Sequence, residues 1–232
     1  MKAVVLLSGG IDSTVLMYAL IAKYEVWPLT INYGQRHVRE VVAARMVCGA
    51  RGGGLLQRLL CIDLGDLGRH IGCTLHGQGD VAQGPYNAEN VETMVSPNRN
   101  MILLSIAAGY AQSIGAERVA YAAHSNDGVV YPDCRPEFVE AVGEALCFGT
   151  GGKVQMFAPF ISWCKSDIVT FGRGLNVPFA KTYSCYEGNE LHCGTCPTCL
   201  DRQTAFEIAD VEDPTRYESP RFEPSFEMKG QW

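Results

Sequence analysis

The segment from Leu7 to Thr14 carries more potential chemistry than any other stretch of its length in this chain. It reads Leu-Ser-Gly-Gly-Ile-Asp-Ser-Thr and lies between two apolar runs, residues 3–7 and 15–21. These runs predict a buried strand and the start of a buried helix. Glycines let a backbone approach an anion closely, and the first N–H groups of a helix attract negative charge. The candidate nucleotide-binding residues are Ser8, Gly9, Gly10, Asp12, Ser13 and Thr14.

Asp12 is unexpected in a simple anion site, because a carboxylate repels a phosphate unless a divalent cation lies between them. The loop therefore predicts a phosphate chain that is bound together with Mg²⁺, a cation that favours carboxylate oxygens. It lacks the G-K-[ST] ending of the common ATPase loop. The simpler interpretation is a turn that only caps a helix, but Asp12 and the flanking elements favour the phosphate site.

A second group of candidate residues consists of four bunched cysteines, Cys185, Cys193, Cys196 and Cys199. Four thiolates with no open position are typical of a structural Zn²⁺ site. An iron–sulfur cluster is the alternative, and the adjacent His192 is an alternative ligand to one cysteine. The start of the chain shows no export signal, so we expect a reducing, cytoplasmic environment and a bound metal rather than disulfides.

The bulk composition limits the classes of function. The chain has 232 residues, 47% of them hydrophobic, which suffices for one sizeable α/β domain with a small appendage. A net charge of −6 and a pI of about 5.4 argue against a nucleic-acid partner. No apolar run approaches the length of a membrane span, so we expect no membrane partner either.

Strand-like and helix-like segments alternate along the chain. Apolar runs predict strands at residues 3–7, 26–32, 56–62, 119–123 and 154–158, and helices beginning at 15 and 165 and spanning 37–50, 101–111 and 136–148. This alternation predicts a doubly wound, mostly parallel five-stranded sheet with both faces covered. Pro28 predicts an edge-like or irregular start of the second strand. Residues 63–97 look like a long loop.

Polar side chains gather after the predicted strands, where parallel α/β sheets bind their ligands. Arg36 and Arg99 have the side chain that binds phosphate or carboxylate bidentately, although Arg36 can equally pair with Glu40 on the next helical turn. His37 is either a ligand-binding or a structural histidine. Other candidates after these strands are Tyr33, Gln35, Asp127, Tyr131, Asp133, Arg135 and Lys165. Asp127 and Asp133 suit the N–H edge of a purine-like ring, or a cap on the segment that follows each of them.

Together these segments resemble one family. The Ser-Gly-Gly-x-Asp-Ser loop is similar to the pyrophosphate loop of the N-type ATP pyrophosphatases. The whole set is similar to the 7-cyano-7-deazaguanine synthase family: Ser8–Thr14, Asn32–His37, Pro97–Asn100, Tyr131–Phe138, Ser184–Tyr186 and Cys193–Cys199. These blocks keep the family's order over about residues 3 to 206.

The resemblance implies a PP-loop fold with a small Cys₄ zinc subdomain, and a ligase that uses ATP and Mg²⁺. It implies that 7-carboxy-7-deazaguanine is adenylated, converted to an amide by ammonia, then activated again and dehydrated to the nitrile. Asp12, Lys165, Arg36 and Arg99 would be catalytic. Substrate would be bound by Tyr33, Gln35, His37, Asp127, Tyr131, Asp133 and Arg135. The resemblance also favours a homodimer.

The chain departs from the family pattern at several positions. Val129 and Val130 replace the Ser-Gly that often precedes Tyr-Pro-Asp-Cys-Arg, Asn98 replaces the glycine of Pro-Gly-Arg, and Asn32 replaces an aspartate. Because valines remove polar groups beside the expected substrate, one alternative is an enzyme that stops at the amide or uses another amine. Less favoured alternatives are a tRNA-thiolating enzyme and a zinc module that holds a nucleotide without chemistry.

The expected organisation has three parts. Residues 1–180 would form the ATP pyrophosphatase domain, 181–209 the cysteine segment with a closing helix, and 210–232 an extended tail. The tail is acidic and rich in aromatic residues. We expect it to lie over the domain or over a partner subunit.

Overall fold

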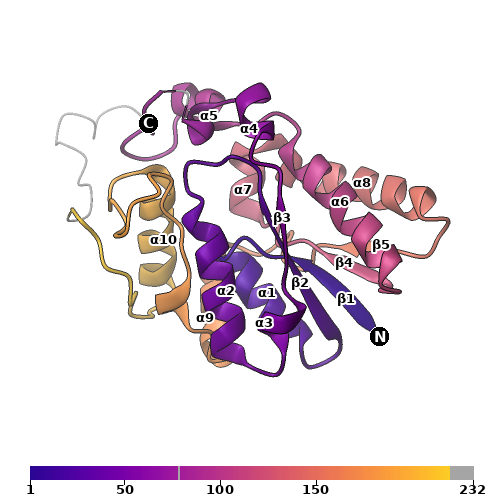
Figure 1. The fold of residues 1–232 in the computed structure, drawn as a ribbon. Coiled ribbons are helices and arrows are strands. Elements are labelled where there is room, and N and C mark those ends of the chain that lie inside the picture. The colour runs from indigo at the N-terminus through magenta and orange to yellow at the C-terminus, as the bar shows by residue number, and fades with distance from the viewer. Residues whose placement is uncertain (78, 220–232) are drawn as a thin grey trace.

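The computed structural model describes residues 1–77 and 79–219 and contains one five-stranded sheet (Figure 1). The strands are β1 (Lys2–Leu6), β2 (Glu25–Asn32), β3 (Leu60–Asp63), β4 (Arg118–Ala120) and β5 (Gln155–Phe157). They pair in the order β3-β2-β1-β4-β5, and every pairing is parallel. The expected parallel α/β fold is confirmed. The strand order reverses between β1 and β4, which is where sheets of this kind bind ligands.

Helices cover both faces of the sheet. They are α1 (Ile11–Leu20), α2 (Arg39–Arg51), α3 (Leu55–Arg58), α4 (Leu67–His70), α5 (Ala88–Met94), α6 (Arg99–Ser113), α7 (Ser125–Val130), α8 (Pro136–Gly149), α9 (Lys165–Gly174) and α10 (Pro197–Ile208). Successive β1 side chains point to opposite faces. Val5 belongs to the core formed with α1, α2, α9 and α10, whereas Val4 packs in the core of α6 and α8 (Figure 1).

The third strand begins later than its apolar run predicts. Residues 55–58 form α3, and β3 begins only at Leu60. Gly54 has a φ of +76° and turns the chain into the helix, which an apolar count cannot detect. The long loop between residues 63 and 97 contains α4 and α5, and the segment after β4 contains α7. These short helices lack the periodic apolar pattern that predicts longer ones.

Pro28 lies inside β2, a strand with neighbours on both sides. It aligns with Val5 of β1, but the pairing with β3 begins at the next residue, Leu29. The proline therefore precedes the β3 ladder and costs it no hydrogen bond. The expectation of an irregular start holds on the β3 side alone.

The described part of the tail returns to the cysteine segment. Asp213 forms an ion pair of 3.1 Å with the fully buried Arg202 of α10, and His192 bridges to Tyr217. Residues 220–232 of the expected tail lie outside the described residues. Within the described ranges, no helix is both long and apolar enough to cross a membrane.

Candidate active site and metal centre

A cavity of about 210 Å³ opens at the carboxyl ends of β1, β2 and β4. Its position at the reversal of strand order is the one expected for a ligand site. Eleven of the predicted site residues line it: Ser8, Gly10, Asp12, Ser13, Tyr33, Gln35, His37, Arg99, Asp127, Tyr131 and Lys165. The cavity therefore brings together segments from almost the whole length of the chain.

The glycine loop leaves the start of α1 open to a ligand. Gly10 is the N-cap residue of α1, and no side chain caps the helix. The Ser8 hydroxyl lies 3.0 Å from that of Ser13 and accepts a hydrogen bond from the N–H of Gly10 at 3.2 Å. These two serines hold the turn in shape. The uncapped N–H groups at the start of α1 provide the partial positive charge that an anion requires.

Gly9 shapes the loop from behind. Its φ is +87°, and a Cβ at this position would lie 2.5 Å from the backbone oxygen of Glu40. The first turn of α2 therefore packs directly on the loop. Only glycine tolerates both the left-handed conformation and this close approach.

Five ionisable side chains form a charged cluster around Asp12. The Lys165 Nζ lies 2.6 Å from Asp201 Oδ2 and 3.6 Å from Asp12 Oδ2. The ring Nε2 of the fully buried His124 lies 3.6 Å from Asp12 Oδ2 and 3.2 Å from Asp127 Oδ2. The cluster therefore joins the loop after β1, the segment after β4, the start of α9 and helix α10.

The cluster keeps Asp12 ionised. Burial alone would raise the pKa of Asp12, but the charges of Lys165 and His124 hold it well below its usual range. The pKa of Asp127 is raised by its burial. Burial would lower the pKa of Lys165, but Asp12 and Asp201 raise it, so the lysine remains a cation.

Three buried atoms of this cluster form no hydrogen bond within the described part of the chain, namely Oδ1 of Asp12 and both ring nitrogens of His124. A buried carboxylate oxygen without a partner costs free energy unless a ligand or ion satisfies it. Carboxylate oxygens are the ligands that Mg²⁺ prefers, so Asp12 fits a divalent cation beside the phosphate loop.

Another part of the cavity lining is aromatic. The hydroxyls of Tyr86, Tyr131 and Tyr186 meet, with Tyr131 and Tyr186 at 2.8 Å. Arg99 lies over the Tyr33 ring, 5.8 Å from its centroid. Flat side chains and one guanidinium suit a planar heteroaromatic ligand that carries a carboxylate.

Five predicted residues do not line the cavity. Thr14 is buried behind the loop, and Gly9 packs on α2. Arg36 pairs with Glu187 at 3.8 Å rather than with Glu40, Asp133 accepts from the Asn100 N–H at the start of α6, and Arg135 donates to the Gly128 carbonyl. Asp133 thus binds the start of α6, which precedes it in the chain, and not the following segment that was the alternative.

Sequence reasoning does not identify the cavity-lining residues Glu40, Tyr186 and Asp201. It also does not identify His124, which is fully buried and contacts Asp12 from outside the cavity lining. Tyr186 directly follows Cys185, and Asp201 lies two residues after Cys199, so the metal interpretation of that segment obscured both. The sequence alone does not show that the cysteine segment packs beside the strand ends, and this packing brings Tyr186 and Asp201 into the cavity.

The departures from the family pattern affect the cavity little. Val129 is 83% exposed, and neither it nor Val130 lines the cavity, so the expectation that they change the surroundings of the substrate is wrong. Asn98 has a φ of 54°, a conformation that glycine and asparagine share. Asn32 accepts from the Gly34 N–H and donates to Asp63, which holds the turn after β2.

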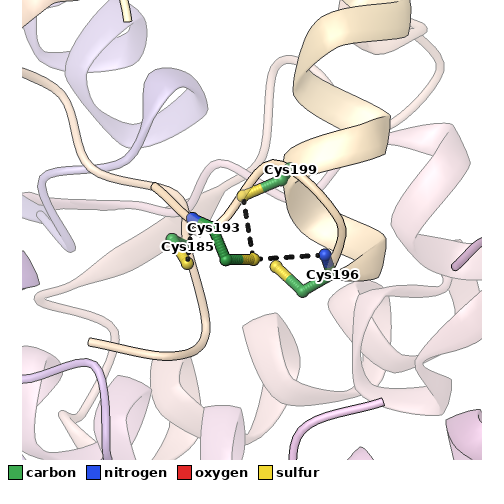
Figure 2. A group of neighbouring side chains, drawn as sticks. All are labelled: Cys185, Cys193, Cys196 and Cys199. Atoms are coloured by element: carbon green, nitrogen blue, oxygen red, sulfur yellow. Dashed lines mark hydrogen bonds between the residues drawn. The ribbon is translucent and has the colours of Figure 1, made fainter. Parts of the chain in front are cut away.

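The four cysteines meet at the start of α10 and form a group that could hold a metal ion (Figure 2). Their sulfur atoms are buried and all lie within 4.8 Å of one another. The Cys193 and Cys199 sulfurs are 3.9 Å apart, close to the spacing of about 3.8 Å that tetrahedral Zn–S bonds require. The ring Nε2 of His192 instead accepts a hydrogen bond from the Ser184 N–H. The donor set therefore fits a metal such as zinc with four thiolates.

Comparison with known proteins agrees with this geometry. The family model described as "Queuosine biosynthesis protein QueC" matches residues 2–210. The curated 7-cyano-7-deazaguanine synthase of Psychromonas ingrahamii is 43% identical over 220 residues, covering 94% of this chain and 98% of that protein. The synthase of the same name from Archaeoglobus fulgidus is 46% identical over 217 residues, covering 92% and 89%. That from Rhizobium rhizogenes is 42% identical over 226 residues, covering 96% and 94%. A family match over nearly the whole chain and relatives at this identity show that the chain belongs to the QueC family.

Proposed function

We propose that this protein is an ATP-dependent carbon–nitrogen ligase that converts 7-carboxy-7-deazaguanine and ammonia to 7-cyano-7-deazaguanine, in 7-deazapurine biosynthesis of the queuosine or archaeosine type. The proposal is supported by the relatives. They are named 7-cyano-7-deazaguanine synthase, and they match this chain over nearly their whole length. One observation of the structure carries it: Asp12, with its unpartnered oxygen, shares a cavity with the uncapped start of α1 and with Lys165.

ATP would bind with its phosphates at the start of α1. The N–H groups there, the hydroxyls of Ser8 and Ser13 and the Lys165 ammonium are the donors, and they are placed before the substrate arrives. Such fixed charges stabilise the negative charge that develops on the phosphates. Asp12 would hold Mg²⁺, which adds positive charge beside the phosphates.

The acid substrate would lie between this cluster and the tyrosines. The tyrosine wall matches the flat face of a deazapurine, and Arg99 offers a fixed cation for its carboxylate. Adenylation forms a bond from a carboxylate oxygen to the α-phosphorus of ATP and releases pyrophosphate. Ammonia then displaces AMP and gives the amide. A second ATP adenylates the amide oxygen and releases pyrophosphate. AMP then leaves with that oxygen, the nitrogen gives up its two protons to water, and the nitrile remains.

The metal would have a structural role. The cysteine segment provides Tyr183, Ser184, Tyr186, Thr198 and Asp201 to the cavity. A closed Cys₄ site would hold both ends of this segment against the sheet. We assign zinc as the metal on the donor set, and we propose that the protein acts in the cytoplasm, where thiols remain reduced.

A homodimer is part of the proposal on the ground of the family resemblance. An exposed apolar stripe is formed by Val42 and Met46 of α2 and by Val38, the residue just before that helix, and a second copy could cover it. Light scattering on the eluting peak of a size-exclusion column measures the mass directly. A monomeric mass at micromolar concentration would contradict this part of the proposal.

The test of the function is mass spectrometry of the product. The zinc-loaded protein is incubated with ATP, Mg²⁺, ammonium and 7-carboxy-7-deazaguanine, and we expect the mass of the nitrile with release of AMP. The mass of the amide alone would show an enzyme that stops one step earlier. Unchanged acid, with no AMP formed, would overturn the proposal.

A further inference from the structure

Glu40 is a cavity-lining carboxyl group without a cationic partner. It lies in the first turn of α2 and lines the cavity, and its side chain is 17% exposed. Within residues 1–77 and 79–219, His37 is the one basic side chain within 4.0 Å of this carboxyl group, with Nε2 3.5 Å from Oε2. A carboxylate in such a position usually has an arginine or lysine beside it.

His37 does not supply the missing charge. Its side chain is 3% exposed, and burial lowers its pKa to about 3, so the ring is neutral at neutral pH. Its Nδ1 is buried and has no hydrogen-bond partner. When the Nε2–H faces Glu40, Nδ1 is an acceptor that lacks a donor. The pair therefore presents a ring nitrogen that lacks a donor and a carboxyl group that His37 faces without supplying a positive charge.

The other charged and titratable groups that the structure describes around Glu40 do not form an ion pair with it either. Arg99 acts on it through space without an ion pair, and its charge only partly offsets the burial that raises the pKa of Glu40 to about 8. Tyr33 lies nearby, and its own pKa is raised to about 12, so it remains neutral. The Tyr186 ring lies 5.3 Å from the His37 ring and closes this side with an aromatic face.

The position of Glu40 and His37 in the cavity suits the binding of a reactant more than the binding of a structural ion. Because the Glu40 carbonyl packs on Gly9, the first turn of α2 adjoins the phosphate loop. The pair also lines the cavity that contains Arg99 and the tyrosines. A small cation with several N–H donors would lie between the proposed phosphate and acid sites. Ammonium has this size, charge and donor number.

We propose that Glu40 and His37 form the ammonium site of this enzyme, and that Glu40 is the base that converts the bound ammonium to ammonia. The inference rests on the proposed function. Before a cation binds, burial keeps a proton on Glu40, but the positive charge of a bound ammonium favours the ionised carboxylate. The Glu40 carboxylate then accepts one proton from NH₄⁺ and becomes a neutral acid. The freed lone pair forms a C–N bond with the acyl carbon, the bond from that carbon to the phosphate oxygen breaks, and AMP leaves with its electron pair. The second proton lost by the nitrogen passes to water.

The test compares two nucleophiles in Glu40→Gln, a substitution that keeps shape and removes the base. With ammonium at neutral pH, we expect the variant to form amide about 100-fold more slowly, the size typical of general-base catalysis. Hydroxylamine is uncharged at neutral pH and needs no deprotonation before it attacks. We expect wild type and variant to form the hydroxamate at equal rates.

Two controls separate this inference from the proposed function. Pyrophosphate exchange into ATP with the acid and without any amine reports adenylation alone, and it should be equal in wild type and Glu40→Gln. Glu144→Gln, on the exposed surface of α8, should behave as wild type with both amines. Absence of exchange in the wild type would overturn the function itself. An unchanged ammonium rate in Glu40→Gln, or an equal loss with both amines, would overturn the ammonium site.

Discussion

The four-cysteine centre and the phosphate-loop cavity are both buried and polar, but they are assembled in opposite ways. The cysteines lie within one short segment, Cys185 to Cys199, and its turns bring the sulfurs together. The charged cluster of the cavity joins Asp12, His124 and Lys165, which lie far apart in the chain. Residue spacing is therefore sufficient to identify the first site, whereas the second exists only after the sheet has formed.

The two regions are also connected. Asp201 follows Cys199 by two residues and lies 2.6 Å from Lys165, and Tyr186 follows Cys185 directly and lines the cavity. The metal segment is thus one wall of the proposed active site. The comparison predicts that each region can be damaged separately, and that residues at the junction couple them.

The largest expected effect is the loss of the metal centre. Cys196→Ser should abolish bound zinc and unfold the cysteine segment, because Cys₄ binding contributes on the order of 10 kcal/mol to segments of this kind. Metal analysis and thermal unfolding measure the two effects. Cys147→Ser, a half-buried cysteine of α8, is the matched control and should keep its metal. Full zinc content in Cys196→Ser would remove that residue from the site.

The next effect concerns the cavity alone. Asp12→Asn should reduce AMP formation by about a thousandfold, because it removes the charge that holds the divalent cation beside the phosphates. Zinc content should be unchanged. The control is Asp66→Asn, whose side chain is 82% exposed. AMP formation at the wild-type rate in Asp12→Asn would show that another group binds the cation.

Asp201→Asn tests the junction. It removes the charged partner of the Lys165 ammonium at 2.6 Å, and we expect kcat/KM for ATP to fall about 30-fold, since a hydrogen bond to a charged group contributes about 2 kcal/mol. Asp201→Glu should restore part of this loss, while both variants keep their zinc. An effect on zinc content equal to that of Cys196→Ser would indicate that Asp201 serves the metal segment only.

The smallest expected effect is a change of the free energy of unfolding with pH, caused by titratable groups in the cavity. The pKa of Glu40 is about 8 in the folded chain against a usual 4.5, so the folded state retains a proton that the unfolded state has released. Stability therefore falls as pH rises from 4.5 to 8. The pKa of His37 is lowered from 6.5 to about 3. The contribution of neutral His37 to folding stability is therefore lost as pH falls from 6.5 to 3.

Above pH 6.5 the His37 contribution is constant, and the Glu40 slope can be measured. Urea unfolding at pH 6.5 and 8 should show a decrease of about 1 kcal/mol in wild type, and Glu40→Gln should show a smaller one. Glu144→Gln is again the control. Equal slopes in Glu40→Gln and wild type would mean that this carboxyl group is already ionised at pH 6.5.

The sequence predicts those site residues whose role depends on their neighbours along the chain. It identified Asp12 in its turn and the four cysteines, and it placed Lys165 after the fifth strand. It did not find Glu40, because a glutamate in the first turn of a surface helix is ordinary by spacing, and only the packing of that turn on Gly9 places it beside the phosphate loop. Likewise Arg36 and Asp133 looked catalytic by type, yet the fold directs Arg36 to Glu187 and Asp133 to the start of α6.

The fold class, the phosphate loop and the metal centre can be predicted from the order of residues within short stretches of the chain. Apolar periodicity indicates which helices and strands form, and the spacing of ligand residues indicates which side chains a single turn can bring together. The composition of the cavity depends on long-range packing. Burial and charge partners decide that Asp12 is ionised and that His37 is neutral, and these are properties of the assembled sheet and of the cysteine segment packed against it.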